Sequence, residues 1–363
     1  MIEVPKGLDD VVVGESAVSL VDGTNGELSY RGVSVDELVN WPFTKVAAWV
    51  VTADGTYDFE TELADEATLS KRESAMVLAL PQTLHPMHVL QASVPALDPT
   101  VAFDDFGEAA QGLSIAAKLP AIVATHLSRS QLTANTDANY IDRFLNQIEA
   151  PQSAVARKAF ETMQILQIEH GFNASTFAGR VIASTLAPIE NALAGAIGTL
   201  HGVLHGGADQ AALETADRLK DVSHARDFVD RCIEGRDKVM GMGHREYRVV
   251  DPRAKHAKRL AKELTEGTEH ESTYHVLEAI EERFTERMAE KGKDLHANIE
   301  FYKGLIYRAI GLPTRFFTTG FAMARVFGYI AHFIESREDN RLIRPAVKYV
   351  GPPVDPEPIP ASA

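Results

Sequence analysis

Short β-prone runs occupy the beginning of the chain. They lie at residues 11–13, 17–21 and 27–30, and the turn signals Asp22-Gly23 and Asn25-Gly26 separate the last two. Alternating runs of this length, joined by such turns, are typical of a small antiparallel hairpin. We therefore predict a minor β element near the N-terminus.

Helix signals dominate the rest of the chain. Ser34 is a good N-cap for a helix that begins at Val35. Longer segments rich in alanine and leucine predict helices over about 109–127, 153–168 and 175–197. The fold class that follows is mainly α, with the β element as an addition at one end.

A change in composition indicates two structural parts. Charged residues are dense over 214–293, whereas 305–334 returns to an apolar pattern. This arrangement predicts a large helical domain made of 1–211 and 315–363, with 212–314 forming a smaller, more exposed domain between them. The tail, 351–363, contains five prolines and is expected to be an extended arm.

Composition and charge exclude several classes of protein. The net charge of −15 repels phosphate backbones, so a nucleic-acid partner is not expected. No apolar run reaches the ~18 residues of a membrane helix, and the N-terminus lacks a signal-peptide pattern. The single cysteine, Cys232, allows no internal disulfide. These features favour a cytoplasmic protein.

Two histidines lie four residues apart in the stretch GTLHGVLHGG, residues 198–207. His201 and His205 could bind zinc, but the glutamate of the usual zinc motif is absent and the glycines disfavour a regular helix. Core histidines are the plain alternative. A third interpretation is that Gly206-Gly207 lets a ligand approach a neutral His205, which then donates a hydrogen bond to a developing oxyanion.

A second group of candidates lies in GMGHREYRVVDPR, residues 241–253. The glycine spacing does not fit a dinucleotide-binding loop. Asp251 and Pro252 predict the N-cap and first residue of a helix. From Arg245 to Lys262 there are seven basic residues and two acidic ones, so this segment is positively charged in a chain whose net charge is negative. That basic face either binds phosphates or carboxylates, or is a solvated helix surface.

A third candidate is Glu300, which lies between Ile299 and Phe301. Apolar flanks tend to raise the pKa of a carboxyl group toward the range of a general base. A surface helix glutamate is the more common fate of this residue type.

Together these motifs resemble the citrate synthase family, including its 2-methylcitrate synthase branch. The resemblance covers nearly the whole chain. It rests on the order of LSYRG, LHPM, EHGFNASTF, LHGGA, GMGH, DPRA, NRLIRP and KYVG along the sequence. It implies a two-domain, mainly helical fold and an acyltransferase activity.

The resemblance also implies site residues. It matches His205 to the histidine that hydrogen-bonds the acetyl-CoA carbonyl, His244 to the one that polarises the oxaloacetate ketone, and Glu300 to the acidic base. Four further residues match the family's ligands of the oxaloacetate or citrate carboxylates: His170, Arg253, Arg325 and Arg344. In the family, the residue matched by Arg344 comes from the partner subunit. Arg248 matches a basic residue that contacts a CoA phosphate.

The implied reaction joins acetyl-CoA to oxaloacetate and hydrolyses citryl-CoA, with no metal or redox cofactor, in a homodimer. Two positions depart from the family pattern: Glu300 stands where aspartate is usual, and Asp209 stands where asparagine is usual. The alternatives are therefore a 2-methylcitrate synthase that uses propionyl-CoA, a weakly active or inactive acyl-CoA-binding paralogue, and a zinc hydrolase built on the histidine pair.

Overall fold

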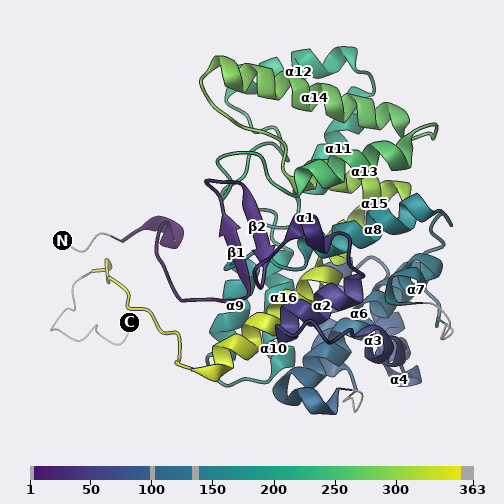
Figure 1. The fold of residues 1–363 in the computed structure, drawn as a ribbon, viewed down its shortest axis with the longest axis vertical. Helices are drawn as coiled ribbons and strands as arrows, with labels where there is room; N and C mark the ends of the chain where they lie inside the picture. The colour runs from purple at the N-terminus through teal and green to yellow at the C-terminus, as the bar shows by residue number, and fades with distance from the viewer. Residues whose placement is uncertain (1–3, 99–102, 133–138, 353–363) are drawn as a thin grey trace, which may run out of the picture.

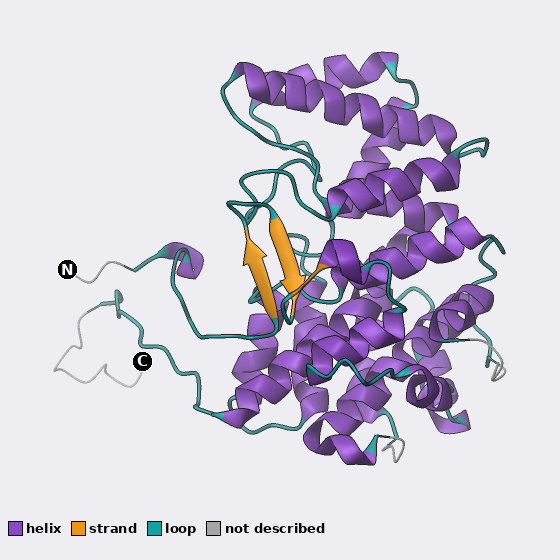
Figure 2. Cartoon of the chain, viewed as in Figure 1, coloured by secondary structure: helices purple, strands orange, loops and turns teal. Residues whose placement is uncertain are grey.

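The computed structural model describes residues 4–98, 103–132 and 139–352, and these form a largely helical protein with one small sheet (Figures 1 and 2). The predicted fold class is therefore confirmed. The part of the predicted arm after residue 352 lies outside the described residues.

The elements follow one another in a simple order. Three strands, β1 Ser19–Asp22, β2 Glu27–Tyr30 and β3 Val33–Ser34, are followed by sixteen α-helices in the described residues. The helices are α1 Val35–Leu38, α2 Phe43–Thr52, α3 Glu60–Glu66, α4 Lys71–Ala79, α5 Pro86–Ser93, α6 Ala110–Ser128, α7 Tyr140–Gln147, α8 Ala154–Gln167, α9 Ala174–Ala183, α10 Ile189–Leu200, α11 Ala208–Leu219, α12 Ser223–Gly235, α13 Ala254–Thr265, α14 Glu271–Glu290, α15 Ile299–Ala309 and α16 Phe317–Glu338.

The N-terminal sheet is antiparallel, in the order β1-β2-β3, with Ser19 opposite Tyr30 and Asp22 opposite Glu27. Its first turn packs on a loop far along the sequence. A Cβ at Gly23 would lie 1.9 Å from the carbonyl oxygen of Glu246, so only glycine fits there. The Arg248 N–H donates to the Gly23 carbonyl at 2.8 Å, which joins the hairpin to the loop that carries His244.

Helix α16 is the centre of the larger body. It contacts α2, α6, α8, α9 and α10, and most of its side chains are buried. Gly328 permits the closest approach, since a Cβ there would come within 2.4 Å of the Ile168 carbonyl oxygen and of the Glu169 carboxylate. The end of α8 therefore lies directly against α16.

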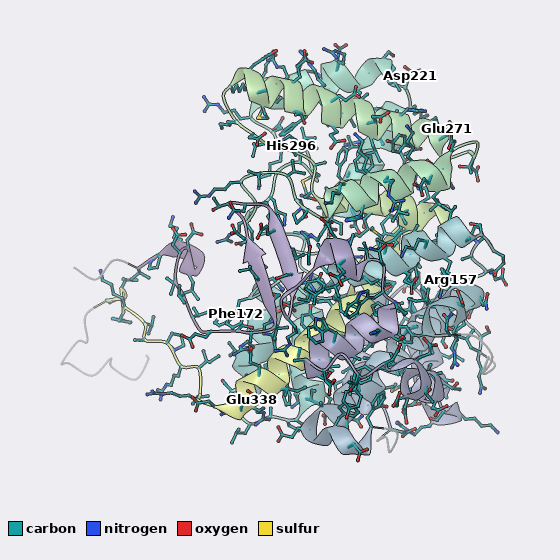
Figure 3. All side chains as sticks on the ribbon, viewed as in Figure 1. Arg157, Phe172, Asp221, Glu271, His296 and Glu338 are labelled. Atoms are coloured by element: carbon teal, nitrogen blue, oxygen red, sulfur yellow. The ribbon has the colours of Figure 1, made fainter. Side chains whose placement is uncertain are left out.

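Helices α11 to α15 gather at the other end of the molecule (Figure 1). There α12 packs on α14, and α15 packs on α11 and α13, while α13 and α15 also contact α8. Figure 3 shows the acidic side chains Asp221 and Glu271 at this outer end. The predicted boundaries of the two domains stay a prediction.

Three local predictions need correction. The apolar run 11–13 forms no strand. The segment 175–197 is two helices, because Leu186 has a left-handed φ of 67° and Pro188, which lacks an N–H, immediately precedes α10. Asp251 is not a helix N-cap: α13 begins only at Ala254. The predicted start at Val35, by contrast, is confirmed, and the Ser34 side chain accepts the Asp36 N–H.

None of the described helices combines the length and the apolar character that a membrane crossing requires.

Candidate active site

Six of the eight predicted site residues come from separate elements and meet between the two ends of the molecule. The His170 and His244 rings are 5.4 Å apart, and His244 Nε2 lies 3.3 Å from an Arg253 nitrogen. The Phe321 ring on α16 contacts His205 and Arg325. The charge of Glu300 acts to raise the pKa of both His205 and His244, so the carboxylate lies near both histidines.

His205 lies in the turn after α10, where its N–H donates to the Gly202 carbonyl at 2.8 Å. Gly206 has a packing role: a Cβ there would lie 2.5 Å from the Leu200 carbonyl oxygen and 2.8 Å from Thr318. The surroundings of His205 favour the predicted neutral imidazole. Burial lowers the pKa of His205 to about 4, and the nearby Arg325 acts in the same direction.

A chain of hydroxyls ends at Nε2 of His205. Tyr329 donates to Ser175 Oγ at 2.7 Å, and Ser175 Oγ is 2.7 Å from both His205 Nε2 and Asn173 Oδ1. Asn173 Oδ1 also accepts the N–H groups of Ser175 and Thr176. The Ser175 hydroxyl donates either to Asn173 Oδ1 or to His205 Nε2, and only the second arrangement puts the proton of His205 on Nδ1.

His244 is held in a single tautomer. Its Nδ1 accepts the N–H groups of Glu246 at 3.0 Å and Tyr247 at 3.3 Å, so the proton is on Nε2. Burial lowers the pKa of His244 to about 4, and Arg253 adds to this effect. Arg253 Nη2 lies 3.3 Å from His244 Nε2, so a buried guanidinium group lies beside this edge of the ring.

Arg253 is buried beside a matching carboxylate. Asp251 accepts hydrogen bonds from both Nε and Nη2 of Arg253 at 2.9 Å. Its second oxygen also accepts the Ile299 N–H at 3.1 Å. Burial acts to raise the pKa of Asp251, but Arg253 outweighs it and holds that pKa below its usual value. This bidentate pair fixes the guanidinium and connects it to the first residue of α15.

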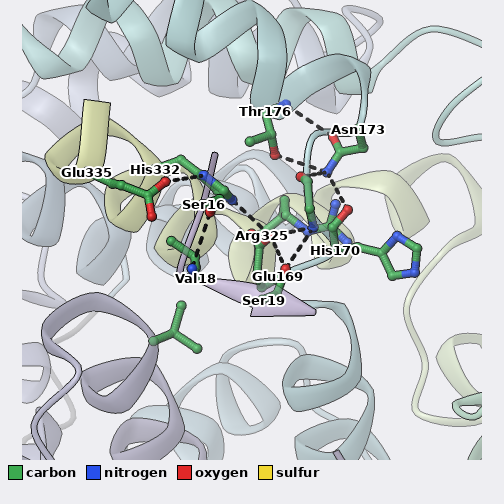
Figure 4. A network of polar contacts seen from close by, with 12 residues as sticks. Ser16, Val18, Ser19, Glu169, His170, Asn173, Thr176, Arg325, His332 and Glu335 are labelled. Carbon is green, nitrogen blue, oxygen red and sulfur yellow. Dashed lines mark hydrogen bonds and ion pairs between the residues drawn. The ribbon is translucent and has the colours of Figure 1, made fainter. Parts of the chain in front are cut away.

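His170 follows α8 and lies 3.1 Å from the Tyr247 hydroxyl through its Nε2. Burial and then the charge of Arg253 lower its pKa well below the usual value. The preceding residue, Glu169, is fully buried and pairs with His332 at 3.0 Å, while Ser19 of β1 donates to the same oxygen at 3.1 Å (Figure 4). This network ties the sheet, α16 and the His170 segment together.

Arg325 is fully buried in α16, where its Nε donates to the Gln167 carbonyl at 2.7 Å. Its guanidinium carbon lies 4.7 Å from the centre of the Phe321 ring. Burial lowers its pKa from the usual value, although the group remains a cation at any working pH. Arg325 therefore adds a second buried positive charge to the site.

Glu300 is the second residue of α15, and its position is tied to the loop of His244. Asn298 accepts the Glu300 N–H at 2.9 Å and donates to the Gly243 carbonyl at 2.7 Å. The carboxylate itself pairs with the ammonium group of Lys303 at 2.5 Å. The surface-glutamate interpretation is wrong, because the Glu300 side chain is only 13% exposed.

Arg248 and Arg344 are exposed, and the structure does not bring them to the other six residues. Much of the basic face of α13 is already paired, since Lys255 bonds Asp36 at 2.6 Å and Lys258 bonds Glu281 at 2.7 Å. For these two lysines the solvated-surface interpretation fits better than a free anion site.

His201 belongs to a different cluster from His205. Its ring stacks on His85 at 4.3 Å and meets His88 edge-on at 4.7 Å. Within the described residues, no three or more His, Cys, Asp or Glu side chains are arranged to hold a metal ion.

Sequence reasoning missed the residues that orient the predicted ones. Ser175 and Tyr329 act on His205, Asp251 acts on Arg253, and Lys303 acts on Glu300. Only Lys303 has a usable signal, because it lies three residues after Glu300, a spacing that puts two side chains on one face wherever the chain is helical. Asp251 is two residues from Arg253 but was interpreted as a helix cap, and the contacts of Ser175 and Tyr329 join segments far apart in sequence.

Comparison with known proteins gives a consistent result. The family model described as citrate synthase, C-terminal domain, matches residues 7–346. The citrate synthase of Synechocystis is 36% identical, over 95% of this chain and 90% of that protein, and the 2-methylcitrate synthase of Shewanella oneidensis is 34% identical, over 95% and 94%.

Solved structures agree with the sequence relatives. The citrate synthase of Thermotoga maritima is 30% identical, covers 99% of this chain and 98% of its own, and superposes with a TM-score of 0.87. The Thermoplasma acidophilum enzyme, solved with carboxymethyl coenzyme A and oxaloacetate, is 28% identical, covers 99% of both chains and has a TM-score of 0.88. The chain belongs to the citrate synthase family, whose members are acyltransferases.

Proposed function

We propose that this enzyme condenses acetyl-CoA with oxaloacetate and hydrolyses the product to citrate and CoA. The observation that carries the proposal is the meeting of one carboxylate, Glu300, with two partly buried histidines, His205 and His244, whose pKa values are lowered to about 4. Such a site can remove a proton from carbon while two separate oxygens receive hydrogen bonds.

The first step makes the nucleophile. Glu300 takes a proton from the methyl group of acetyl-CoA, and the Nδ1–H of His205 donates to the thioester oxygen as charge develops there. A neutral imidazole suits this task, because its pKa is closer to that of an enol than the pKa of an imidazolium would be. Ser175, when it donates to Nε2, holds His205 in the tautomer that the step needs, and Tyr329 donates to Ser175.

The second step makes the carbon–carbon bond. The Nε2–H of His244 donates to the ketone oxygen of oxaloacetate, and the enol attacks the ketone carbon. Oxaloacetate is a dianion, so the buried guanidinium groups of Arg253 and Arg325 are suited to its carboxylates. His170 lies beside them as a further donor. Water then hydrolyses the thioester and releases CoA.

These side chains supply a base, two donors and a cationic clamp, so we expect no metal or redox cofactor. By the resemblance, Arg248 contacts a CoA phosphate, and Arg344 of the partner subunit completes the clamp in a homodimer. Both residues are exposed, which leaves them available for these contacts. The expected cytoplasmic location stays a prediction.

The second candidate is 2-methylcitrate synthase. The relatives support this candidate, because a citrate synthase and a 2-methylcitrate synthase match the chain at similar identity, 36% and 34% respectively. One methylene on the acyl group changes transition-state binding by only about 1–3 kcal/mol, so the same residues serve either substrate.

Release of free thiol from acetyl-CoA or propionyl-CoA, with oxaloacetate present, tests the proposal. We expect a higher kcat/KM with acetyl-CoA. A preference for propionyl-CoA would assign the 2-methylcitrate activity. CoA binding without turnover of either thioester would identify a non-catalytic paralogue, and dependence of activity on zinc would support the hydrolase alternative.

A further inference from the structure

A buried lysine lies behind the proposed base. Lys303 Nζ is 2.5 Å from a Glu300 oxygen, 3.0 Å from Gln167 Oε1 and 3.2 Å from an Asp209 oxygen. The Lys303 and Asp209 side chains are 0% exposed. The ammonium also lies 4.6 Å from the centre of the Phe321 ring, the ring that contacts His205 and Arg325.

The chain is built to bring these groups together. Glu300 and Lys303 are three residues apart on α15 and so share one face of the helix. Asp209 lies in the first turn of α11, which packs on α15. Gly304 permits that contact, since a Cβ there would be 2.7 Å from the Asp209 carbonyl oxygen. Asp209 is therefore held against Lys303 by the packing of two backbones.

A lysine beside a general base has opposing effects. The ammonium orients the carboxylate, but its positive charge stabilises the ionised form and so makes the carboxylate a weaker base. A second carboxylate offsets that charge. With Asp209 ionised, the pair Asp209–Lys303 is neutral as a unit, and Glu300 keeps its own negative charge.

We propose that Lys303 and Asp209 are positioning residues for Glu300: Lys303 holds the longer glutamate side chain at the place where it removes the substrate proton, and Asp209 cancels the charge that this contact would otherwise impose. The inference rests on the proposed function, in which Glu300 is the base. It also connects both departures from the family pattern, Glu300 and Asp209, through a single side chain.

The titration of Asp209 gives the arrangement a measurable property. Burial raises the pKa of Asp209 to about 6, although Lys303 acts to lower it. The other titratable groups that interact with this cluster are Tyr307 on α15, His205 and His244, and both histidines have pKa values lowered to about 4. Near pH 6, Asp209 is therefore the member expected to change charge.

Four proteins test the proposal: the wild type, Lys303→Met, Asp209→Asn and the double variant. In Lys303→Met the two carboxylates face each other without a cation, and Glu300 loses its anchor. We expect kcat to fall about 100-fold, the size of effect that a shift of about 1 Å in a catalytic group produces, with an unchanged KM for oxaloacetate. Asp209→Asn should lower kcat about tenfold at pH 8, because Lys303 then weakens the base.

The double variant separates positioning from simple packing. Removing both charges relieves the repulsion that Lys303→Met creates, so we expect the double variant to be about tenfold more active than Lys303→Met alone. A loss equal to the product of the two single losses would overturn the coupling between Asp209 and Lys303.

The pH profile is the second readout. As the pH falls through 6, the wild type should lose activity when Asp209 becomes neutral. Asp209→Asn is in that state at every pH, so its kcat should lack the inflection. An inflection near pH 6 that persists unchanged in Asp209→Asn would contradict the role given to this residue.

Lys118 offers a matched control. It is a buried lysine on α6 that pairs with Glu73 at 3.1 Å, away from the site residues. Lys118→Met should lower the melting temperature without altering the shape of the pH profile. If Lys303→Met changes only stability, as Lys118→Met is expected to do, the positioning role is wrong while the base assignment stands. If Glu300→Gln keeps turnover, the base assignment itself is wrong.

Discussion

On one side of the candidate site, a buried arginine pairs with a single carboxylate: Arg253 donates two hydrogen bonds of 2.9 Å to Asp251. On the other side, the buried Lys303 is shared by two carboxylates, Glu300 and Asp209. The first arrangement is balanced and rigid, and it leaves part of the guanidinium free for an anion. The second carries one excess negative charge, which a base requires.

The difference shows that buried ion pairs serve two purposes in one site. In the proposed function, a balanced pair presents a fixed cation to a dianionic substrate, and Arg253 takes this role. An unbalanced cluster orients a carboxylate, as Lys303 does for Glu300. Substitutions on the two sides should therefore separate binding from turnover.

The largest effect should come from Glu300→Gln. The amide cannot accept a proton from carbon, so we expect kcat to fall at least about 1,000-fold while oxaloacetate binding is retained. Thiol release and calorimetric titration with oxaloacetate measure the two quantities. Turnover near the wild-type level would assign the base to another group.

Asp251→Asn should act mainly on binding. Arg253 would lose its buried counter-charge, so we expect the KM for oxaloacetate to rise about 100-fold and the free energy of unfolding to fall by ~3 kcal/mol. Asp217→Asn is the control, because Asp217 pairs with Arg308 at 2.6 Å on the surface and should change stability by less than ~1 kcal/mol. If Asp251→Asn and Asp217→Asn change the KM for oxaloacetate and the free energy of unfolding equally, Asp251 has no special role in holding Arg253.

Ser175→Ala should lower kcat about tenfold by releasing His205 from its tautomer, with little change in the KM for oxaloacetate. Tyr329→Phe removes the donor to Ser175 and should act in the same direction, and the double variant should be no worse than Ser175→Ala. Nitrogen NMR of His205 reports the tautomer directly. A proton found on Nε2 in the wild type would contradict the relay.

The last prediction concerns the dependence of folding stability on pH, which does not separate the two sides of the site. The lowered pKa values of His170, His205 and His244 mean that the folded state binds fewer protons than the unfolded state between pH 6.5 and about 4. Stability should therefore fall as the pH falls through this window. The contribution of His332 to this pH dependence has the opposite sign. Burial acts to lower the pKa of His332, but Glu169 outweighs it and raises that pKa. Urea midpoints at pH 7 and pH 5 measure the net result, and a higher midpoint at pH 5 would contradict it.

Local signals in the sequence predicted much of the fold. The turns at Asp22-Gly23 and Asn25-Gly26, the cap at Ser34 and the apolar spacing of α6 and α8 depend on neighbours within a few residues, and all appear in the structure. Two features could not be predicted from these local signals: the helix break before Pro188 and the late start of α13. At the first, Leu186 adopts a left-handed backbone conformation, and at the second the Asp251 side chain binds Arg253.

The sequence by itself determined the helical class, the family resemblance and the chemical identity of His205, His244 and Glu300. Only the tertiary structure decided their states: which nitrogen of His244 carries the proton, which carboxylate faces Arg253, and that Lys303 lies between Glu300 and Asp209. The physical reason is that tautomer, charge and orientation depend on exact geometry, both where partners are close in sequence, as Asp251 and Arg253 are, and where they come from distant segments, as Ser175 and Asp209 do. The distant partners meet only when α8, α9, α11, α15 and α16 pack together.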